Sequence, residues 1–227
     1  TMQENRLFAP VQEFVDNAHV NSKEQYDAMY KESIDNPDKF WGDIAETFTW
    51  KKKWDRVINW DNAPVARWFD GAQLNITENC LDRHLETDRM NKTALIWEGE
   101  PGDELKLTYA ELHERVCQAA NMLKKLGVKK GDRITIYLPM IPELMISVLA
   151  CARLGAIHSV VFGGFSSNAI LDRVKDAESN LVITADGGFR RGKKLNLKNI
   201  VDEGINKTDI VKTCVVVKRA ECEHTMV

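Results

Sequence analysis

The chain has 227 residues, of which 44% are apolar and 29% charged, and its formal net charge is -3. This composition is typical of a globular chain with room for one large or two small domains. A net negative charge argues against general nucleic-acid or membrane-surface binding, because both require a broad basic face. Any basic site must therefore be local, and neither nucleic acid nor membrane is an expected partner.

Five cysteines are scattered along the chain without a C-x-x-C pair: Cys80, Cys117, Cys151, Cys214 and Cys222. Their odd number and apolar surroundings indicate free thiols in a reducing compartment rather than disulfides. No set of side chains has metal-ligand spacing, so no metal site is expected. Neither a signal peptide nor a transmembrane run is recognisable, Thr1 precedes Met2 as a residue left by cloning would, and the expected location is the cytoplasm.

Residues 1–90 are expected to form a mainly helical, irregular and aromatic-rich leader. Ser22 and Gln25 form a capping-box pattern that opens a helix through about Ser33, and a shorter helix runs from Asn36–Pro37 through Ala45. Tryptophans crowd the next stretch: Trp41, Trp50, Trp54, Trp60 and Trp68. They could line a ligand cage, but such density more often attaches an irregular segment to a larger body, and we favour this packing role.

Asp82, Arg83 and His84 suggest a catalytic group at first sight. Adjacent residues on a helix point in different directions, however, and cannot converge on one substrate atom. Surface polar contacts and a helix cap are the better interpretation.

Residues 91–227 predict an α/β fold with a parallel sheet layer flanked by helices. Thr93–Glu98 and Glu104–Thr108 indicate a hairpin, and Thr108 with Glu111 caps a helix that Gly127 ends. Alternating strands and helices then follow at Arg133–Leu138, Glu143–Leu154, Ala156–Phe162, Ser166–Glu178 and Asn180–Ala185. A polar helix at Lys198–Lys207 and a buried strand at Ile210–Val217 complete the pattern.

Strands joined through helices run parallel, and right-handed crossovers bring the turns after them to one carboxyl edge, where ligands bind. Two signals fall at that edge. Gly163–Gly164 removes two Cβ atoms, so that a ligand can approach the backbone, although such a pair also makes a simple tight turn. The run Arg190–Lys194 holds four cations in five residues and suits a phosphate group, although a solvated basic turn is the alternative.

Several long strings lie in and around this region: Trp68–Asn75, Asn79–His84, Ile96–Gly99, Leu149–Gly155, Ala156–Ser166 and Val182–Asp186. Together they resemble the acetyl-coenzyme A synthetases, a branch of the AMP-forming adenylate-forming ligases. The resemblance extends from about Tyr26 to Val217. Propionyl-CoA synthetases resemble the same stretches, so the choice of acid stays open.

This resemblance implies a two-step ligase that uses acetate, ATP, Mg²⁺ and coenzyme A (CoA). It covers only the first third or so of such an enzyme, so residues 91–227 correspond to the first part of its AMP-binding domain. The family's phosphate loop, metal and late lysine match nothing here and are expected after Val227. The chain itself is thus expected to carry no catalytic residue, to have the rest of its own chain as partner, and to be inactive alone.

The residues that the resemblance assigns to CoA are Phe162, Gly163, Gly164, Arg190, Arg191, Gly192 and Lys193. The glycine turn would lie by the CoA adenine, and the basic loop would contact the phosphates. Lys193 stands where the family usually has arginine, which keeps the charge but loses the forked geometry. From another class, the alternative is a non-catalytic nucleotide-binding or scaffolding module that reuses this layer.

Overall fold

The computed structural model describes residues 6–226, so Thr1 and Met2 lie outside the described residues. The chain divides into two compact units, Thr1–Leu74 and Asn75–Val227. The division falls before residue 90, where the sequence suggested a boundary. Within residues 6–226, no helix is both long and apolar enough to cross a membrane.

In the described part of the first unit, residues 6–74, there are three helices and a two-stranded hairpin. The helices are α1 (Gln12–Asn17), α2 (Lys23–Asp35) and α3 (Pro37–Ala45), and antiparallel strands β1 (Arg56–Asn62) and β2 (Val65–Asp70) follow. The Ser22 hydroxyl accepts a hydrogen bond from the Gln25 N–H, which confirms the predicted cap. The hairpin was not predicted.

The crowded aromatic residues of this unit pack against one another. Trp50, Trp54 and Phe69 have ring centroids 5.3 to 5.6 Å apart, and Trp41 lies 6.0 Å from Trp68. Edge-on and tilted ring pairs at these distances are favourable packing contacts. These rings therefore pack on one another within the first unit, and their role in attaching this segment to a larger body stays a prediction.

The second unit begins with short helical turns and a hairpin that lead into its sheet. The turns are η1 (Glu78–Asp82), α4 (Arg83–Leu85) and η2 (Asp88–Asn91), and the antiparallel hairpin joins β3 (Thr93–Glu98) to β4 (Glu104–Thr108). The long helix α5 (Tyr109–Lys125) carries the complete capping box between Thr108 and Glu111 that the sequence predicted.

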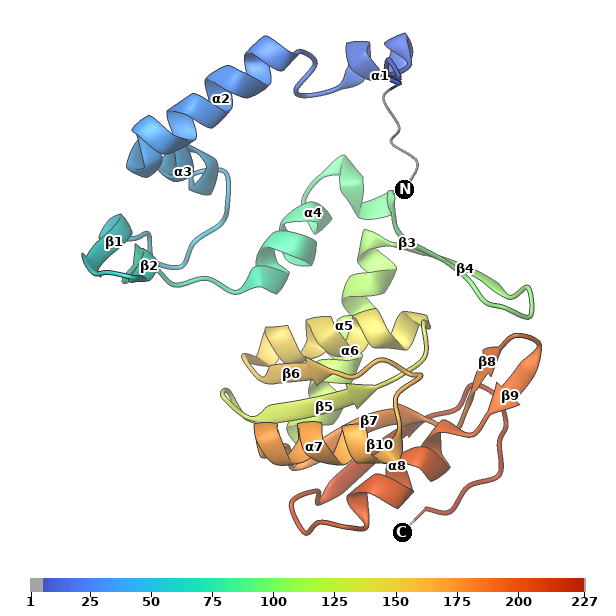
Figure 1. Ribbon diagram of the computed structural model, residues 1–227. Coiled ribbons are helices and arrows are strands. Elements are labelled where there is room, and N and C mark those ends of the chain that lie inside the picture. The colour runs from blue at the N-terminus through green and yellow to red at the C-terminus, as the bar shows by residue number, and fades with distance from the viewer. Residues whose placement is uncertain (1–5, 227) are drawn as a thin grey trace. The chain divides into compact units, whose positions relative to one another are not determined.

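A four-stranded parallel sheet organises this unit (Figure 1). Its strands are β5 (Arg133–Tyr137), β6 (Ile157–Val160), β7 (Leu181–Ala185) and β10 (Thr213–Val217), in the order β10-β7-β5-β6. The crossover helices are α6 (Pro142–Leu154), α7 (Ser167–Ala177) and α8 (Leu197–Ile205). Helix α6 covers one face with α5, and α7 and α8 cover the other. The predicted parallel α/β layer is confirmed.

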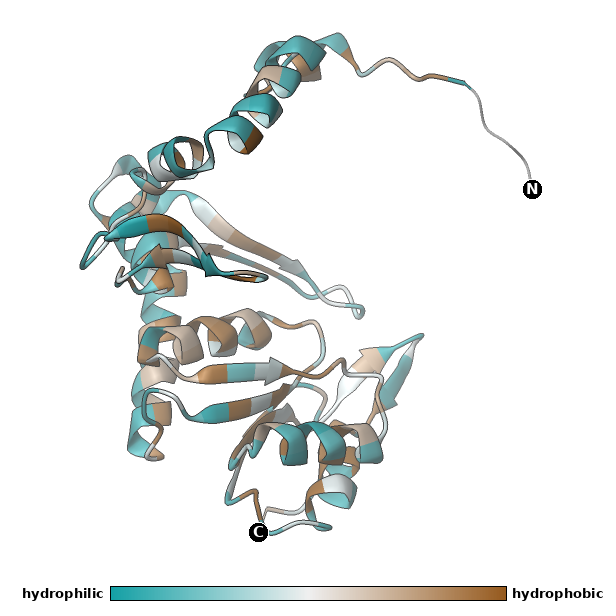
Figure 2. Ribbon diagram, turned by 60° about the vertical axis from the view of Figure 1, so that its left-hand side comes forward, coloured by the Kyte–Doolittle hydropathy of each residue, from teal (hydrophilic) through white to brown (hydrophobic). Residues whose placement is uncertain are grey.

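Burial follows from these two helical layers. Ile134, Ile136 and Val182 on the central strands have no exposed surface, and Ala150 and Cys151 on α6 have none either. Apolar colour accordingly runs through the sheet and α6 in Figure 2, whereas α2 of the first unit is largely hydrophilic. Strands buried on both faces read as continuous apolar runs, which explains why their positions could be predicted.

A second short hairpin lies after β7. Strands β8 (Gly188–Arg190) and β9 (Lys193–Leu195) pair antiparallel, and their turn contains Arg191 at φ 53° and Gly192 at φ 72°. From the sequence, these residues were expected to form only a loop. The hairpin therefore splits the basic run between two strands and a turn.

Candidate functional site

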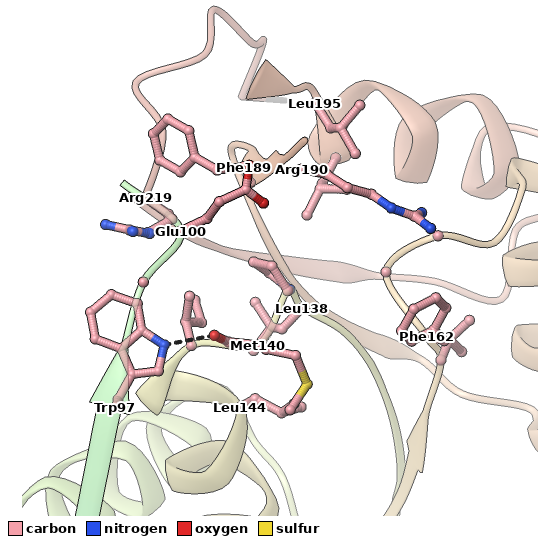
Figure 3. A pocket seen from close by; sticks show the side chains of 18 of the residues that line it. Trp97, Glu100, Leu138, Met140, Leu144, Phe162, Phe189, Arg190, Leu195 and Arg219 are labelled. Carbon is pink, nitrogen blue, oxygen red and sulfur yellow. Dashed lines mark hydrogen bonds between the residues drawn. The ribbon is translucent and has the colours of Figure 1, made fainter. Parts of the chain in front are cut away.

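A cavity of about 340 Å³ opens in the second unit, beside the carboxyl ends of β5, β6 and β7. The turn after β5 supplies Leu138–Ile141, and the turn after β6 supplies Val161–Gly164. The remaining walls include Trp97, Phe189, Arg190 and Arg219, which Figure 3 labels. This cavity thus lies at the edge of the sheet where the sequence predicted a ligand site, and ligand binding there stays a prediction.

The indole of Trp97 forms one apolar wall of the cavity. Its Nε1–H donates a hydrogen bond to the carbonyl oxygen of Met140 at 2.7 Å, shown as a dashed line in Figure 3. This bond attaches the β3–β4 hairpin to the turn after β5. An indole fixed through its polar edge keeps its apolar face available for contacts in the cavity.

Close approach explains the glycine pair of the β6 turn. A Cβ atom on Gly164 would lie 2.8 Å from Nη1 of Arg190, and one on Gly163 would lie 3.3 Å from the carbonyl oxygen of Leu138. Neither glycine has a positive φ. The glycines thus give space beside the arginine and the neighbouring turn rather than an unusual backbone conformation, and a side chain at 164 would displace the Arg190 guanidinium.

Tyr137 anchors this glycine turn through its hydroxyl group. Its hydroxyl, at the end of β5, donates to the carbonyl oxygens of Phe165 at 2.9 Å and Gly163 at 3.3 Å. Burial raises the pKa of the phenol above its ordinary value, so the group stays protonated and remains a donor. The turn is thereby fixed on a fully buried anchor.

The seven residues assigned by resemblance divide into two groups. Phe162, Gly163, Gly164 and Arg190 line the cavity. Arg191, Gly192 and Lys193 lie outside its lining, at the exposed turn and the start of β9. The Gly192 N–H donates to the Glu100 carboxylate at 2.6 Å.

The end of β8 explains this division. Arg190 is the last residue of that strand, whereas Arg191 lies in the turn with a left-handed backbone at φ 53°, so the chain changes direction between the two arginines. Arg190 is directed toward the glycine turn of β6 in Figure 3. Lys194, at the end of the basic run, donates instead to the carbonyl oxygen of Ala220 at 2.6 Å and lies 5.9 Å from the Phe189 ring.

Arg219 is a second cation of the cavity, and it was not among the residues predicted from the sequence. Its guanidinium carbon lies 4.9 Å from the Trp97 ring centroid and 5.1 Å from that of Phe189, and Nη2 donates to Asp103 at 2.5 Å. Arginine over aromatic rings forms favourable cation–π contacts. Arg219 follows β10 at the same carboxyl edge, so the rule that located the cavity would also have indicated this residue.

Asp186, at the end of β7, fixes the segment that carries Arg219. Its carboxylate accepts hydrogen bonds from the backbone N–H groups of Gly187, Arg219, Ala220 and Cys222 at 2.7 to 3.2 Å. Burial raises the pKa of this carboxyl, but the four N–H donors outweigh burial and hold the pKa below its ordinary value. Asp186 is thus an ionised structural anchor behind the cavity wall.

Asp82 takes part in an ion pair rather than in a catalytic group. Arg153 donates to both of its oxygens, at 2.7 and 2.9 Å, and His113 Nε2 lies 3.3 Å from Oδ1. The Arg153 hydrogen bonds hold the pKa of Asp82 below its ordinary value. The His84 ring instead packs 4.7 Å from Tyr109. The neighbours diverge as expected, but the Asp82 side chain makes no capping hydrogen bond to α4, so the predicted helix cap is wrong.

All five cysteines are free, and Cys151 is fully buried. Burial raises the pKa of the Cys151 and Cys214 thiols to about 11, so both remain protonated at neutral pH. Across residues 6–226, no cluster of three or more His, Cys, Asp or Glu side chains could hold a metal ion.

Comparisons with known proteins identify the family. The AMP-binding enzyme family matches residues 81–226, and the family described as acetyl-coenzyme A synthetase N-terminus matches residues 26–80. The chain therefore belongs to the AMP-binding enzyme family. Its two family matches also follow the order expected from the resemblance to the acetyl-coenzyme A synthetases.

Individual relatives agree with this assignment. The chain is 52% identical to acetyl-coenzyme A synthetase of Chlorobaculum tepidum over 217 residues, which is 96% of this chain and 33% of the relative. It is 53% identical to that of Leptospira biflexa, covering 99% of this chain and 35% of the relative. Acetoacetyl-CoA synthetase from Streptomyces lividans aligns with a TM-score of 0.82 at 28% identity, over 93% of this chain and 33% of that one. The chain thus spans about a third of the length of these relatives.

Proposed function

We propose that the chain supplies one wall of the CoA site of an AMP-forming acetate–CoA ligase. In the proposed reaction, an acetate oxygen attacks the α-phosphate of ATP and releases pyrophosphate, and the CoA thiol then displaces AMP from acetyl-adenylate. The 52% and 53% identity to acetyl-coenzyme A synthetases supports acetate as the acid. The phosphate loop, the Mg²⁺ site and the catalytic lysine are proposed to lie in further residues of the parent protein.

The position of Arg190 carries this proposal. Its guanidinium lies against Gly164 within the cavity, where it can donate forked hydrogen bonds to a phosphate. The Phe162 ring lines the same cavity with 59% of its surface exposed, so a planar adenine can stack on it. One cation and one exposed ring at adjacent positions suit the nucleotide end of CoA.

The remaining basic residues are assigned a weaker role. Arg191 and Lys193 are exposed outside the cavity lining, where salt screens their attraction for phosphate. We propose that they raise the local phosphate concentration at the cavity mouth, whereas Arg190 forms the direct contact. Arg219, between two rings and next to Asp103, completes the opposite wall.

The test is CoA binding by this chain, measured by isothermal titration calorimetry for the wild type, Arg190→Ala and Arg173→Ala. Arg173 is exposed on α7 and outside the cavity, so its replacement removes the same charge at a site that does not line the cavity. We expect Arg190→Ala to weaken binding by roughly tenfold, as for one charge-assisted hydrogen bond in a wet site. Equal affinities in all three proteins, or no binding at all, would contradict the proposal.

The complete ligase offers a second measurement that separates the two half-reactions. CoA takes no part in adenylation, so Arg190→Ala should raise the KM for CoA and leave acetate-dependent exchange of pyrophosphate into ATP unchanged. Loss of both in equal measure would assign Arg190 to the fold or to the ATP site. The 227-residue chain alone should catalyse no such exchange; activity above a no-protein control would place the adenylation site within it.

A further inference from the structure

The carboxylate of Glu100 is bound at the turn of the β8–β9 hairpin. Oε1 of Glu100 lies 2.6 Å from the Gly192 nitrogen and accepts its hydrogen bond. Gly192 stands between Arg191 and Lys193, both exposed. A backbone N–H between two cations is a binding group for an anion, and a carboxylate fills it here.

The hairpin between β3 and β4 is built to bring Glu100 to this position. The Gly99 N–H donates to the Asp103 carbonyl at 2.7 Å and the Gly102 N–H donates to the Gly99 carbonyl at 2.9 Å, which closes the turn. Asp103 then pairs with Arg219, which lines the cavity. Two carboxylates of this hairpin turn thus accept hydrogen bonds from the segment that follows β7: Glu100 from the Gly192 N–H, and Asp103 from the Arg219 guanidinium.

The charges around the turn favour exchange of this carboxylate for a phosphate. Glu98 and Glu100 are the acidic groups among the residues that line the cavity, while Arg191 and Lys193 flank Gly192 in the hairpin. A phosphate dianion gains more from these two cations than a single carboxylate charge does. Glu100 is exposed and Gly192 has open space beside its Cα, so the side chain can rotate away without disturbing the core.

We propose that Glu100 is a specificity residue: its carboxylate occupies the phosphate position of the basic turn in the free chain, and a phosphate dianion displaces it. This inference rests on the proposed CoA site and adds a competitor to it. Monoanions such as acetate or chloride offer no more charge than Glu100 and do not displace it. Phosphate-bearing ligands therefore reach the turn selectively.

The experiment compares the wild type with Glu100→Gln and with the matched variant Glu104→Gln, in the same hairpin but outside the cavity lining. Inorganic pyrophosphate is the probe, titrated by calorimetry and by the ¹⁵N–¹H resonance of Gly192. We expect Glu100→Gln to bind pyrophosphate about threefold to fivefold more tightly, because exposed charge contacts are screened. Glu104→Gln should change the affinity by less than about twofold.

The chemical shift of the Gly192 amide gives a second readout that does not depend on the measured affinity. In the ligand-free Glu100→Gln variant this amide should shift, and pyrophosphate should move it further, whereas it should stay near its wild-type position in Glu104→Gln. An unchanged or weaker affinity for Glu100→Gln, an unmoved Gly192 resonance, or an absence of pyrophosphate binding in both proteins would overturn the proposal.

CoA as a second probe separates this proposal from the proposed function. If pyrophosphate behaves as expected but CoA binds neither protein, the Glu100 mechanism stands and the CoA assignment fails. If CoA binds the wild type and Glu100→Gln equally, the CoA site stands and Glu100 is no competitor.

Discussion

The two units of the chain use their apolar side chains in opposite ways. In the second, a sheet between two helical layers removes residues such as Ile136 and Val116 completely from solvent. In the first, Tyr30 and Ile34 on α2 keep 59% and 63% of their surface exposed. Apolar residues alone therefore do not make a core: a core requires elements on both sides to enclose them.

The sharpest test of this contrast compares one large-to-small substitution in each unit. Ile136→Ala on β5 should lower the free energy of unfolding by about 2–5 kcal/mol, because a cavity opens in a fully packed layer. Tyr30→Ala on α2 should cost less than about 1 kcal/mol, since its ring packs mainly on Tyr26. Urea titrations followed by circular dichroism measure both. Equal losses would show that the first unit has a tight core of its own.

A smaller effect is expected from the buried polar anchor of the second unit. Asp186→Asn preserves volume but replaces one accepting oxygen by a donor, so at least one of the four N–H groups loses its partner. The expected loss is about 2–3 kcal/mol of unfolding free energy, as for an unpaired buried group next to a lost charge. Thermal unfolding measures it. A change in melting temperature no larger than for the surface control Glu104→Gln would show that the carboxylate is dispensable.

The smallest effect concerns the half-buried pair of Asp82 and Arg153. Arg153→Met should cost about 1 kcal/mol at neutral pH, because the pair is partly exposed to water. The pKa of Asp82 is lowered in the folded chain, so its contribution is present above the ordinary carboxyl pKa and is lost as pH falls through the folded value. Wild type and variant should therefore converge in stability at acidic pH. A difference that does not change with pH would exclude a charge-dependent contact.

The helices and strands of the second unit were predicted closely wherever the pattern of apolar residues allowed only one type of element. Long apolar runs between capped helices admit few arrangements, and Pro142 and Gly155 mark the ends of α6 in the structure as their chemistry requires. The β1–β2 hairpin was missed because Arg56–Asn62 mixes charged, amide and aromatic residues without strict alternation. Such a strand is recognised only from its partner.

In the candidate site, too, the sequence pattern located some residues and left others unidentified. The carboxyl-edge rule found the glycine turn and Arg190, since it depends only on the direction of parallel strands. It could not separate Arg190 from Arg191, because β8 and β9 have three residues each and leave no periodicity to read. Nor could it find Trp97, whose place depends on a hydrogen bond to Met140, 43 positions away in the sequence.

The four N–H groups that Asp186 gathers have a consequence for folding kinetics. Three of them come from positions 33 to 36 residues further along the chain, and they meet the carboxylate only once β10 has paired with β7. Contacts of this sequence separation form after the entropy of loop closure has been lost. The wall that carries Arg219 should thus assemble together with the last strand. During refolding, the proposed affinity for CoA should return in the same kinetic phase as the native circular dichroism, with no earlier phase of its own.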